Sequence, residues 1–310
     1  MIKQRLEKSE LPLSKLSILA VQHMFAMFGA TVLVPSLTGL NPGVALFSSA
    51  VGTLLFHIIT KGKVPAYLGS SFAFIGPIIA AKEGYGLPAA LLGCFVAGII
   101  YITMAAIIRK IGTDFIDEYL PPVVVGPVIM TIGLGLAPTA KSMAMAHLPT
   151  AIFTLAVTIG ISVVGRGMLK VVPILIGIIS GYIFAFIVGI VDITPVINAN
   201  WFAMPNFTSV FELKTVGAGI SAIALIAPVA IVTMVEHLGD VLALSKTVDQ
   251  EFIEEPGLHR TLLGDGVATA FASLVGGPPN TTYGENIGVL AITGVHDPVI
   301  VELAAIFVLA

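Results

Sequence analysis

The chain has 310 residues, of which 56% are hydrophobic and only 11% are charged, and its net charge is -3. Soluble domains carry about 25% charged residues. This composition therefore excludes an ordinary soluble protein and predicts an all-α polytopic membrane protein. The single cysteine, Cys94, excludes a disulfide framework. We expect no nucleic-acid binding, no metal site and no organic cofactor.

Hydropathy predicts the membrane spans. Apolar runs of about 17–25 residues can cross a bilayer as helices, and full spans are expected at 16–37, 43–60, 88–108, 122–139, 149–165, 171–191, 217–243 and 259–275. Two interrupted spans, the third and the tenth, are expected at 66–81 and 280–294, and a last apolar run begins near 298. The intervening segments predict a short interfacial helix at 113–120 and an external loop at 192–214 with an interfacial Trp201.

Basic residues are distributed unevenly between the two sides of these spans. If the N-terminus is cytoplasmic, only Lys82, Lys141 and Lys214 fall on the outer side, and all other lysines and arginines fall inside. An excess of Lys and Arg marks cytoplasmic loops. We therefore expect a multi-pass protein of the cytoplasmic (inner) membrane with a cytoplasmic N-terminus.

The two interrupted spans share a pattern. Tyr67–Phe72 and Thr281–Gly284 each predict a short extended strand that leads into a half-helix. Non-helical backbone at membrane depth is tolerated only where protein or a water-filled cavity covers it. Interrupted hydrophobic segments are also typical of transporter binding sites. We expect the strands to pair near the midplane and their ends to form a substrate site.

A weak internal repeat connects the two halves of the chain. Gln22-His23 in the first span corresponds to Glu236-His237, and the two interrupted spans correspond to each other. An odd number of spans separates the copies, which predicts an inverted repeat, as in many secondary transporters. Because the second copy stops inside a span at Ala310, we expect the chain to be part of a longer protein.

Carboxylates within spans are the first candidate site residues, because a charge at membrane depth is costly unless it is paired or hydrated. Glu236 and Asp240 lie four residues apart on one helix face, and Glu285 lies at a break. Such groups accept hydrogen bonds from ring N–H groups and, when protonated, donate to ring carbonyls. They suit a flat, polar substrate and a transported proton. Each acid could instead be a satisfied core residue, an interpretation that weighs most for Asp240.

Other side chains complete the candidate site. Phe72 and Tyr283 can stack on a planar ring, and backbone amides near Phe72 and Gly284 favour electron-rich ligand atoms. Gln22 is a candidate to orient Glu236 or the substrate. The candidates for proton coupling are Glu236, Asp240, His237 and His23, although a lone intramembrane histidine more often joins two helices by a hydrogen bond. Three further ionisable residues are expected near the membrane interface: His57, Asp265 and Glu302.

Several motifs resemble one transporter family. The segments Pro65–Phe74 and Pro256–Arg260 and, most specifically, Glu285-Asn286-Ile287-Gly288 followed by Thr293-Gly294 are similar to those of the nucleobase/ascorbate transporter (nucleobase:cation symporter) family. Glutamate at the first position of the last motif resembles the bacterial uracil permeases of this family, whereas its purine carriers usually have glutamine.

This resemblance implies an inverted repeat of about seven plus seven helices, in which a core domain moves against a gate domain in alternating access. It assigns 1–112 and 207–310 to the two halves of the core and 113–206 to the first half of the gate. By resemblance, Glu236 and Glu285 bind uracil, Phe72 and Gly284 add backbone contacts, uptake is proton-coupled, and a homodimer is a candidate assembly. Asp240 replaces a histidine that some uracil carriers have at a position linked to proton coupling.

Three alternatives were weighed against uracil transport. A xanthine or uric acid carrier of the same family is favoured by Asp240 but disfavoured by Glu285. An intramembrane aspartyl protease using Asp240 and Asp265 would need Gly-x-Gly-Asp, which neither position has. Channels use rings of polar groups from symmetric subunits, and the paired breaks fit a cradle for one substrate better. We therefore expect a transporter and not an enzyme.

Overall fold

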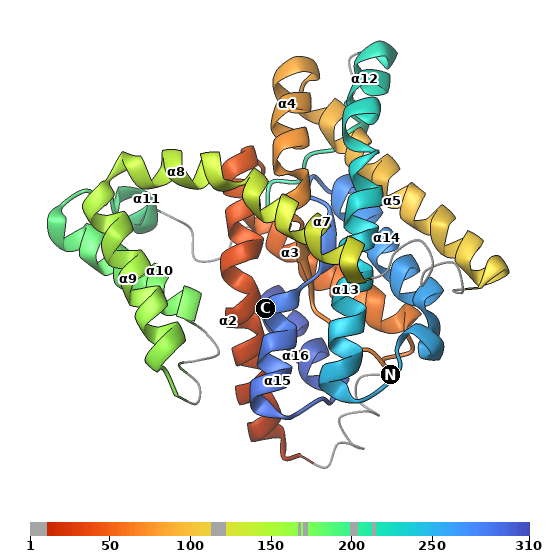
Figure 1. Cartoon of the computed structure of the whole chain (residues 1–310). Coiled ribbons are helices and arrows are strands. Elements are labelled where there is room, and N and C mark those ends of the chain that lie inside the picture. Colours follow the sequence, from red (N-terminus) through yellow and green to blue (C-terminus); the bar gives the residue numbers. More distant parts are fainter. Residues whose placement is uncertain (1–10, 113–121, 167–168, 170–172, 199–203, 213–214) are drawn as a thin grey trace. The chain divides into compact units, whose positions relative to one another are not determined.

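The computed structural model describes residues 11–112, 122–166, 169, 173–198, 204–212 and 215–310, and this part of the chain is mostly helical (Figure 1). The predicted interfacial helix at 113–120 and the predicted interfacial Trp201 lie outside the described residues. The contacts divide the chain into two compact units, Met1–Ile132 with Asn206–Ala310, and Gly133–Pro205.

The first unit contains two short strands among its helices. Its elements in chain order are α2 (Leu13–Thr38), α3 (Pro42–Ile59), β1 (Leu68–Ser70), η1 (Phe72–Phe74), α4 (Ile75–Tyr85), α5 (Leu87–Ile111), most of α7 (Pro122–Gly135), η3 (Val210–Glu212), α12 (Val216–Ile226), α13 (Val229–Val248), η4 (Ile253–Gly257), α14 (Leu258–Leu274), β2 (Asn280–Thr282), α15 (Gly284–Thr293) and α16 (Pro298–Leu309). The second unit contains α8 (Ala137–Ala146), α9 (Leu148–Val164), α10 (Pro173–Val188) and the short α11 (Thr194–Ile197).

Helix lengths and ends follow from the sequence. Within the described residues, five helical stretches are long and apolar enough to cross a membrane: Leu13–Thr38, Pro42–Ile59, Leu87–Ile111, Gly126–Ala146 and Val216–Val248. The Asn41 side chain caps α3 by accepting hydrogen bonds from the amides of Gly43 and Val44. Gly39 ends α2 with a φ of 68°, a left-handed conformation that glycine adopts without steric cost.

Two predicted spans differ from the observed helices. The single helix expected at 217–243 is divided into α12 and α13 by a turn at Ala227 and Pro228. Proline lacks an amide hydrogen and its ring clashes with the preceding helical turn, which explains the interruption. A turn at Leu136 likewise separates α7, which ends at Gly135, from α8, which begins at Ala137.

Small residues allow the helices of the first unit to approach closely. Helix α14 packs against α5 and α3, and α16 packs against α2 and α3. A Cβ added at Gly98 of α5 would lie 2.7 Å from the Ala270 amide nitrogen, and one at Gly266 of α14 would lie 2.7 Å from Tyr101 Cβ. Glycine pairs of this kind bring helix backbones together in membrane proteins. The α5–α14 contact therefore depends on them.

The second unit is built around two neighbouring apolar helices. Helices α9 and α10 pack together, and the rings of Phe153 and Phe184 stack with their centroids 4.6 Å apart. Many large apolar side chains of these helices, such as Ile152 and Val163, are exposed. Exposed apolar helix surfaces are expected where lipid rather than water surrounds a protein.

Candidate functional site

The candidate site begins with the paired strands. β1 and β2 are antiparallel, with Leu68 opposite Thr282, Gly69 opposite Thr281 and Ser70 opposite Asn280. A further backbone hydrogen bond extends the pair at each end, from the Ser71 amide to the Pro279 carbonyl and from the Tyr283 amide to the Tyr67 carbonyl, both at 2.9 Å. The pairing satisfies backbone groups that would otherwise be costly to bury.

One polar stripe on α3 holds β1. The Ser49 hydroxyl donates to the Leu68 carbonyl at 2.6 Å, and the Leu68 amide donates to Thr53 Oγ1 at 3.0 Å. One turn further along α3, His57 Nε2 lies 3.1 Å from the Ala66 carbonyl oxygen. These side chains are spaced four residues apart, so they lie on one face of the helix. The start of β1 and the residues before it are thereby held against α3.

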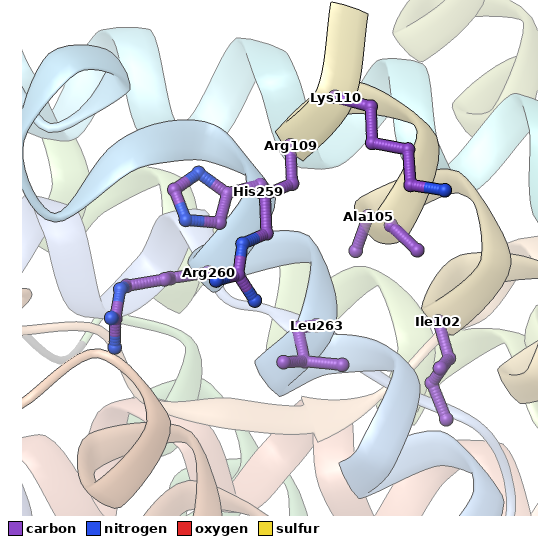
Figure 2. Close-up of a pocket in the computed structure, with 8 residues that line it drawn as sticks. Ile102, Ala105, Arg109, Lys110, His259, Arg260 and Leu263 are labelled. Carbon is purple, nitrogen blue, oxygen red and sulfur yellow. The ribbon is translucent and has the colours of Figure 1, made fainter. Parts of the chain in front are cut away.

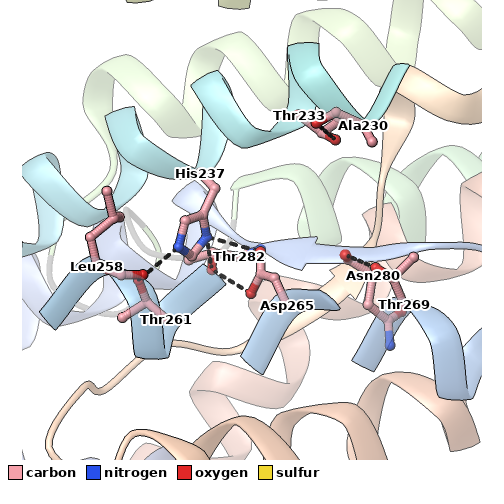
Figure 3. Close-up of polar contacts among 9 residues, drawn as sticks. All are labelled: Ala230, Thr233, His237, Leu258, Thr261, Asp265, Thr269, Asn280 and Thr282. Carbon is pink, nitrogen blue, oxygen red and sulfur yellow. Dashed lines mark hydrogen bonds and ion pairs between the residues drawn. The ribbon is translucent and has the colours of Figure 1, made fainter. Parts of the chain in front are cut away.

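A matching polar stripe on α14 holds β2, as Figure 3 shows. The Thr269 hydroxyl donates to the Asn280 carbonyl at 2.8 Å, and the Thr282 amide donates to Asp265 Oδ2 at 3.3 Å. Thr261, one turn earlier on α14, bonds at 2.9 Å to Nε2 of a histidine on α13, His237. The α14 side chains have the same four-residue spacing as those on α3. The two strands are therefore supported in the same manner from two different helices.

His237 and Asp265 form a buried polar pair in this network. His237 Nδ1 lies 2.9 Å from Asp265 Oδ2, and both side chains are 0% exposed. The Thr282 hydroxyl donates to Asp265 Oδ1 at 3.2 Å and lies 3.1 Å from His237 Nδ1. The pair joins α13, α14 and β2, so the side chain of His237 supports the strand.

His57, Asp265 and Glu302, which the sequence places near the membrane interface, have side chains that are buried within the protein. His57 Nδ1 lies 3.4 Å from Glu302 Oε1 between α3 and α16. Hydropathy placed these residues near the ends of apolar runs, but it does not report which helix face carries them. The four-residue spacing of Ser49, Thr53 and His57 in the sequence indicates that one face of α3 is polar.

Three carboxylates gather where β2 leads into α15. Glu236 and Asp240 on α13 are partly buried, whereas the side chain of Glu285 is exposed. Glu236 lies within electrostatic range of Glu285 and Asp265, and Asp240 within range of Glu236 and Glu285. A Cβ added at Gly284 would lie 3.6 Å from Asp240 Oδ1. The structure thus brings together the acids and the glycine that the sequence singled out.

Both half-helices begin with uncapped amides. Ser71 precedes η1 and Tyr283 precedes α15, and neither makes a side-chain capping hydrogen bond. The first amides of a helix lack intrahelical partners and attract electron-rich groups. Phe72, the first residue of η1, is partly buried, and η1 packs against α13. Phe72 and Gly284 therefore begin half-helices whose first amides have no side-chain cap, and Gly284 lies close to Asp240 on α13.

Tyr283 has a different environment from Phe72. Its side chain is 4% exposed, and its hydroxyl donates to the Ser70 carbonyl at 2.9 Å while Thr31 on α2 bonds to the same hydroxyl. A Cβ at Gly69 would collide with the Tyr283 ring. The structure thus directs this aromatic ring across β1 and toward α2.

Helix α2 contributes Gln22 and His23, which are both buried. The Asn286 side-chain amide donates to His23 Nδ1 at 3.0 Å and to the His23 carbonyl at 3.1 Å. This contact joins α15 to α2 and makes His23 Nδ1 an acceptor. Asn286 was missed as a supporting residue, although its place beside Glu285 in the motif was visible in the sequence.

Several buried polar atoms near the strands make no hydrogen bond with the described part of the protein. They are Glu236 Oε2, Ser71 Oγ, Thr281 Oγ1 and Asn286 Oδ1. A buried polar group without a partner costs about 1–3 kcal/mol, so a ligand that offers a hydrogen bond to Glu236 Oε2 would be stabilised there. Among the described residues, no cluster of His, Cys, Asp and Glu could hold a metal ion.

Comparison with known proteins gives the family and several relatives. The model of the permease family matches residues 14–310. A uracil permease of Bacillus caldolyticus is 53% identical over 301 residues, which cover 94% of this chain and 70% of that protein. A uracil permease of Escherichia coli (strain K12) is 44% identical over 309 residues, covering 96% of this chain and 70% of that protein.

A solved structure shares the fold. The transmembrane domain of a cyanobacterium bicarbonate transporter, BicA, superposes with a TM-score of 0.72 and covers 97% of this chain and 83% of that one. At 13% sequence identity, this likeness concerns the fold alone and gives no information on the substrate.

Proposed function

Because the chain belongs to the permease family, and is therefore a multi-pass membrane transporter and not an enzyme, we propose that it carries uracil into the cell together with protons. Support for uracil comes from the relatives, which are named uracil permeases at 53% and 44% identity. They do not favour the xanthine or uric acid alternative. The proposed location is the cytoplasmic membrane, with the N-terminus inside.

The proposed binding residues are Glu236, Glu285, Phe72, Gly284, Tyr283 and Gln22. Uracil is a flat ring that presents N–H donors and carbonyl acceptors. Carboxylates can accept from its N–H groups, and the uncapped amides at the start of η1 and α15 can donate to its carbonyls. Phe72 offers a ring face for stacking. Tyr283 acts on the site through Ser70, whose carbonyl it holds.

The observation that carries this proposal is the environment of Glu236. Its Oε2 atom is buried without a hydrogen-bond partner among the described residues, and Glu285 is within electrostatic range. Two carboxylates held close together repel unless a donor or a proton lies between them. A ring with N–H groups can donate hydrogen bonds to both carboxylates, and a transported proton can neutralise one of them, so either would remove this repulsion.

Proton coupling is assigned to the same region, with Glu236, Asp240, His237 and His23 as the candidates. The contacts favour the acids over the histidines as the mobile proton site. His237 is held by Asp265 and Thr261, and His23 is held by Asn286. Asp240 has no such partner in the described hydrogen-bond network and lies beside Gly284.

We also propose an inverted repeat and alternating access. The antiparallel strands and the equivalent polar stripes on α3 and α14 support two related halves of opposite orientation. In this proposal 1–112 and 207–310 belong to a core domain that carries the substrate, and 113–206 belongs to a gate domain. The separation of Gly133–Pro205 as a compact unit supports this division.

Uptake of radiolabelled uracil by proteoliposomes with the full-length protein tests the proposal. We expect saturable uptake that is faster with an inward proton gradient and that unlabelled uracil, but not xanthine, inhibits. A gradient-insensitive flux would refute proton coupling, and inhibition by xanthine at equal concentration would refute the assignment of uracil as the preferred substrate.

A further inference from the structure

A cavity outside the proposed uracil site lies where α5 ends and α14 begins (Figure 2). Its volume is about 460 Å³, which falls within the range of about 300–1,000 Å³ typical of small-molecule sites. Both helices belong to the first unit, and they are in direct contact along their length. The cavity is therefore a feature of one compact part of the chain.

Basic side chains from both helices line this cavity: Arg109, Lys110, His259 and Arg260. Arg109 and Lys110 are in the last turn of α5 and are exposed, whereas His259 and Arg260 are partly buried in the first turn of α14. Arg260 donates to the Ile59 backbone carbonyl at 3.0 Å, a contact that does not neutralise its charge. The ion pairs within the described residues involve other side chains. An anion placed here would meet several positive groups at once.

The remaining lining of the cavity is apolar. Ile102, Ala105 and Leu263 lie on the side away from the helix ends, and Figure 2 shows Ile102 and Leu263 below Arg109 and Lys110. A free inorganic anion needs no apolar surface. A phospholipid has both an anionic phosphate and acyl chains, and basic pockets between membrane helices are known to bind such headgroups.

We propose that the cavity binds the phosphate of an anionic phospholipid, with Arg109 and Arg260 as its main ligands and an acyl chain against Ile102 and Leu263. Arginine matches phosphate oxygens with paired N–H donors, whereas lysine acts as a point charge. A bound headgroup would join the end of α5 to the start of α14. It would thereby stabilise the contact that Gly98 and Gly266 make possible deeper in the membrane.

The test is equilibrium binding of short-chain phosphatidylglycerol to the purified full-length protein in detergent. Phosphatidylcholine is the neutral-headgroup comparison, and inorganic phosphate is a soluble competitor. We expect phosphatidylglycerol to bind at least about tenfold more tightly than phosphatidylcholine, and inorganic phosphate to compete only at far higher concentration. Equal affinity for the two lipids, or displacement by equimolar phosphate, would overturn the proposal.

Variants locate the binding to this cavity. The double variant Arg109→Gln, Arg260→Gln should weaken phosphatidylglycerol binding by about tenfold or more, while Lys246→Gln, at an exposed lysine in the last turn of α13, should bind as the wild type does. If the double variant does not fold, the single variant Arg109→Gln, at an exposed position of α5, should still weaken phosphatidylglycerol binding relative to Lys246→Gln. Wild-type affinity in a folded glutamine variant refutes the proposal.

Discussion

Replacing Asp265 with asparagine should weaken the link between α14 and β2 without changing the size of the side chain. Asp265 accepts hydrogen bonds from the Thr282 amide and hydroxyl and pairs with His237 at 2.9 Å. An asparagine retains one acceptor oxygen and directs an NH₂ group toward a former donor. At least one buried donor is then left without an acceptor.

The expected magnitude follows from the burial of this pair. Both side chains are 0% exposed, and leaving a buried hydrogen-bonding group without its partner costs about 1–3 kcal/mol. For a chain of this size or somewhat larger, a loss of about 3 kcal/mol lowers the melting temperature by roughly 3–5 °C. Uracil affinity should also fall, because Thr282 precedes the Tyr283-Gly284 end of the proposed site.

Thermal unfolding of the full-length protein in detergent, with and without uracil, measures both effects. The matched control is Asp192→Asn, at an exposed loop aspartate that accepts a hydrogen bond from the Thr194 amide. It should leave the melting temperature and the affinity for uracil unchanged. A double-mutant cycle with His237→Gln should give a coupling of about 1–3 kcal/mol. Additive effects of the two substitutions would refute the argument that they act as a pair.

Other predictions concern the strands and a surface ion pair. Gly69→Ala should abolish uptake or folding, since its Cβ would collide with the Tyr283 ring; wild-type uptake in membrane vesicles would show that the ring can move aside. Tyr283→Phe should lower the free energy of unfolding by about 1 kcal/mol, because it removes the hydrogen bond to the Ser70 carbonyl. Thermal unfolding measures this loss, and an unchanged melting temperature would argue against a stabilising role for the hydrogen bond. The Lys63 ammonium holds the pKa of exposed Glu255 below its usual range. The pair therefore stabilises the protein above the unfolded pKa of Glu255, which is about 4.3. This stabilisation is lost as the pH falls through the lowered pKa of Glu255 in the folded protein. Glu255→Gln should therefore lower the melting temperature slightly at neutral pH but not in acid; an equal shift at both pH values would contradict this assignment.

The sequence was sufficient to predict a mostly helical chain with several apolar helices and two non-helical segments between them. Helix length depends on apolar run length, and the interruptions carry local signals, since glycine and hydroxyl residues surround Ser70 and Thr281. The division at Pro228 was also available from local chemistry, but the long apolar run around it favoured one continuous helix. The prediction gave more weight to the hydropathy of the whole run than to a single proline. In the structure, the steric effect of Pro228 divides the run into two helices.

The buried polar contacts could not be predicted in the same way. Hydropathy estimates how deep a residue lies in the membrane, but the pairing of His57 with Glu302 depends on which faces of α3 and α16 meet. The same holds for His237 and Asp265, which are distant in sequence. By contrast, Glu236 could be recognised as a site residue from the chain alone, because an acid in the middle of an apolar span needs a functional reason.

The central claim is that Glu236 and Glu285 bind the uracil ring beside the paired strands. Equilibrium binding of radiolabelled uracil to the purified full-length protein tests it most directly, with Glu236→Gln, Glu285→Gln and, as a matched control, Glu83→Gln at an exposed position of α4. Loss of a charged acceptor should weaken binding by roughly 10- to 100-fold in each site variant, with no change in the control. Wild-type affinity in a folded Glu236→Gln or Glu285→Gln protein would contradict the account.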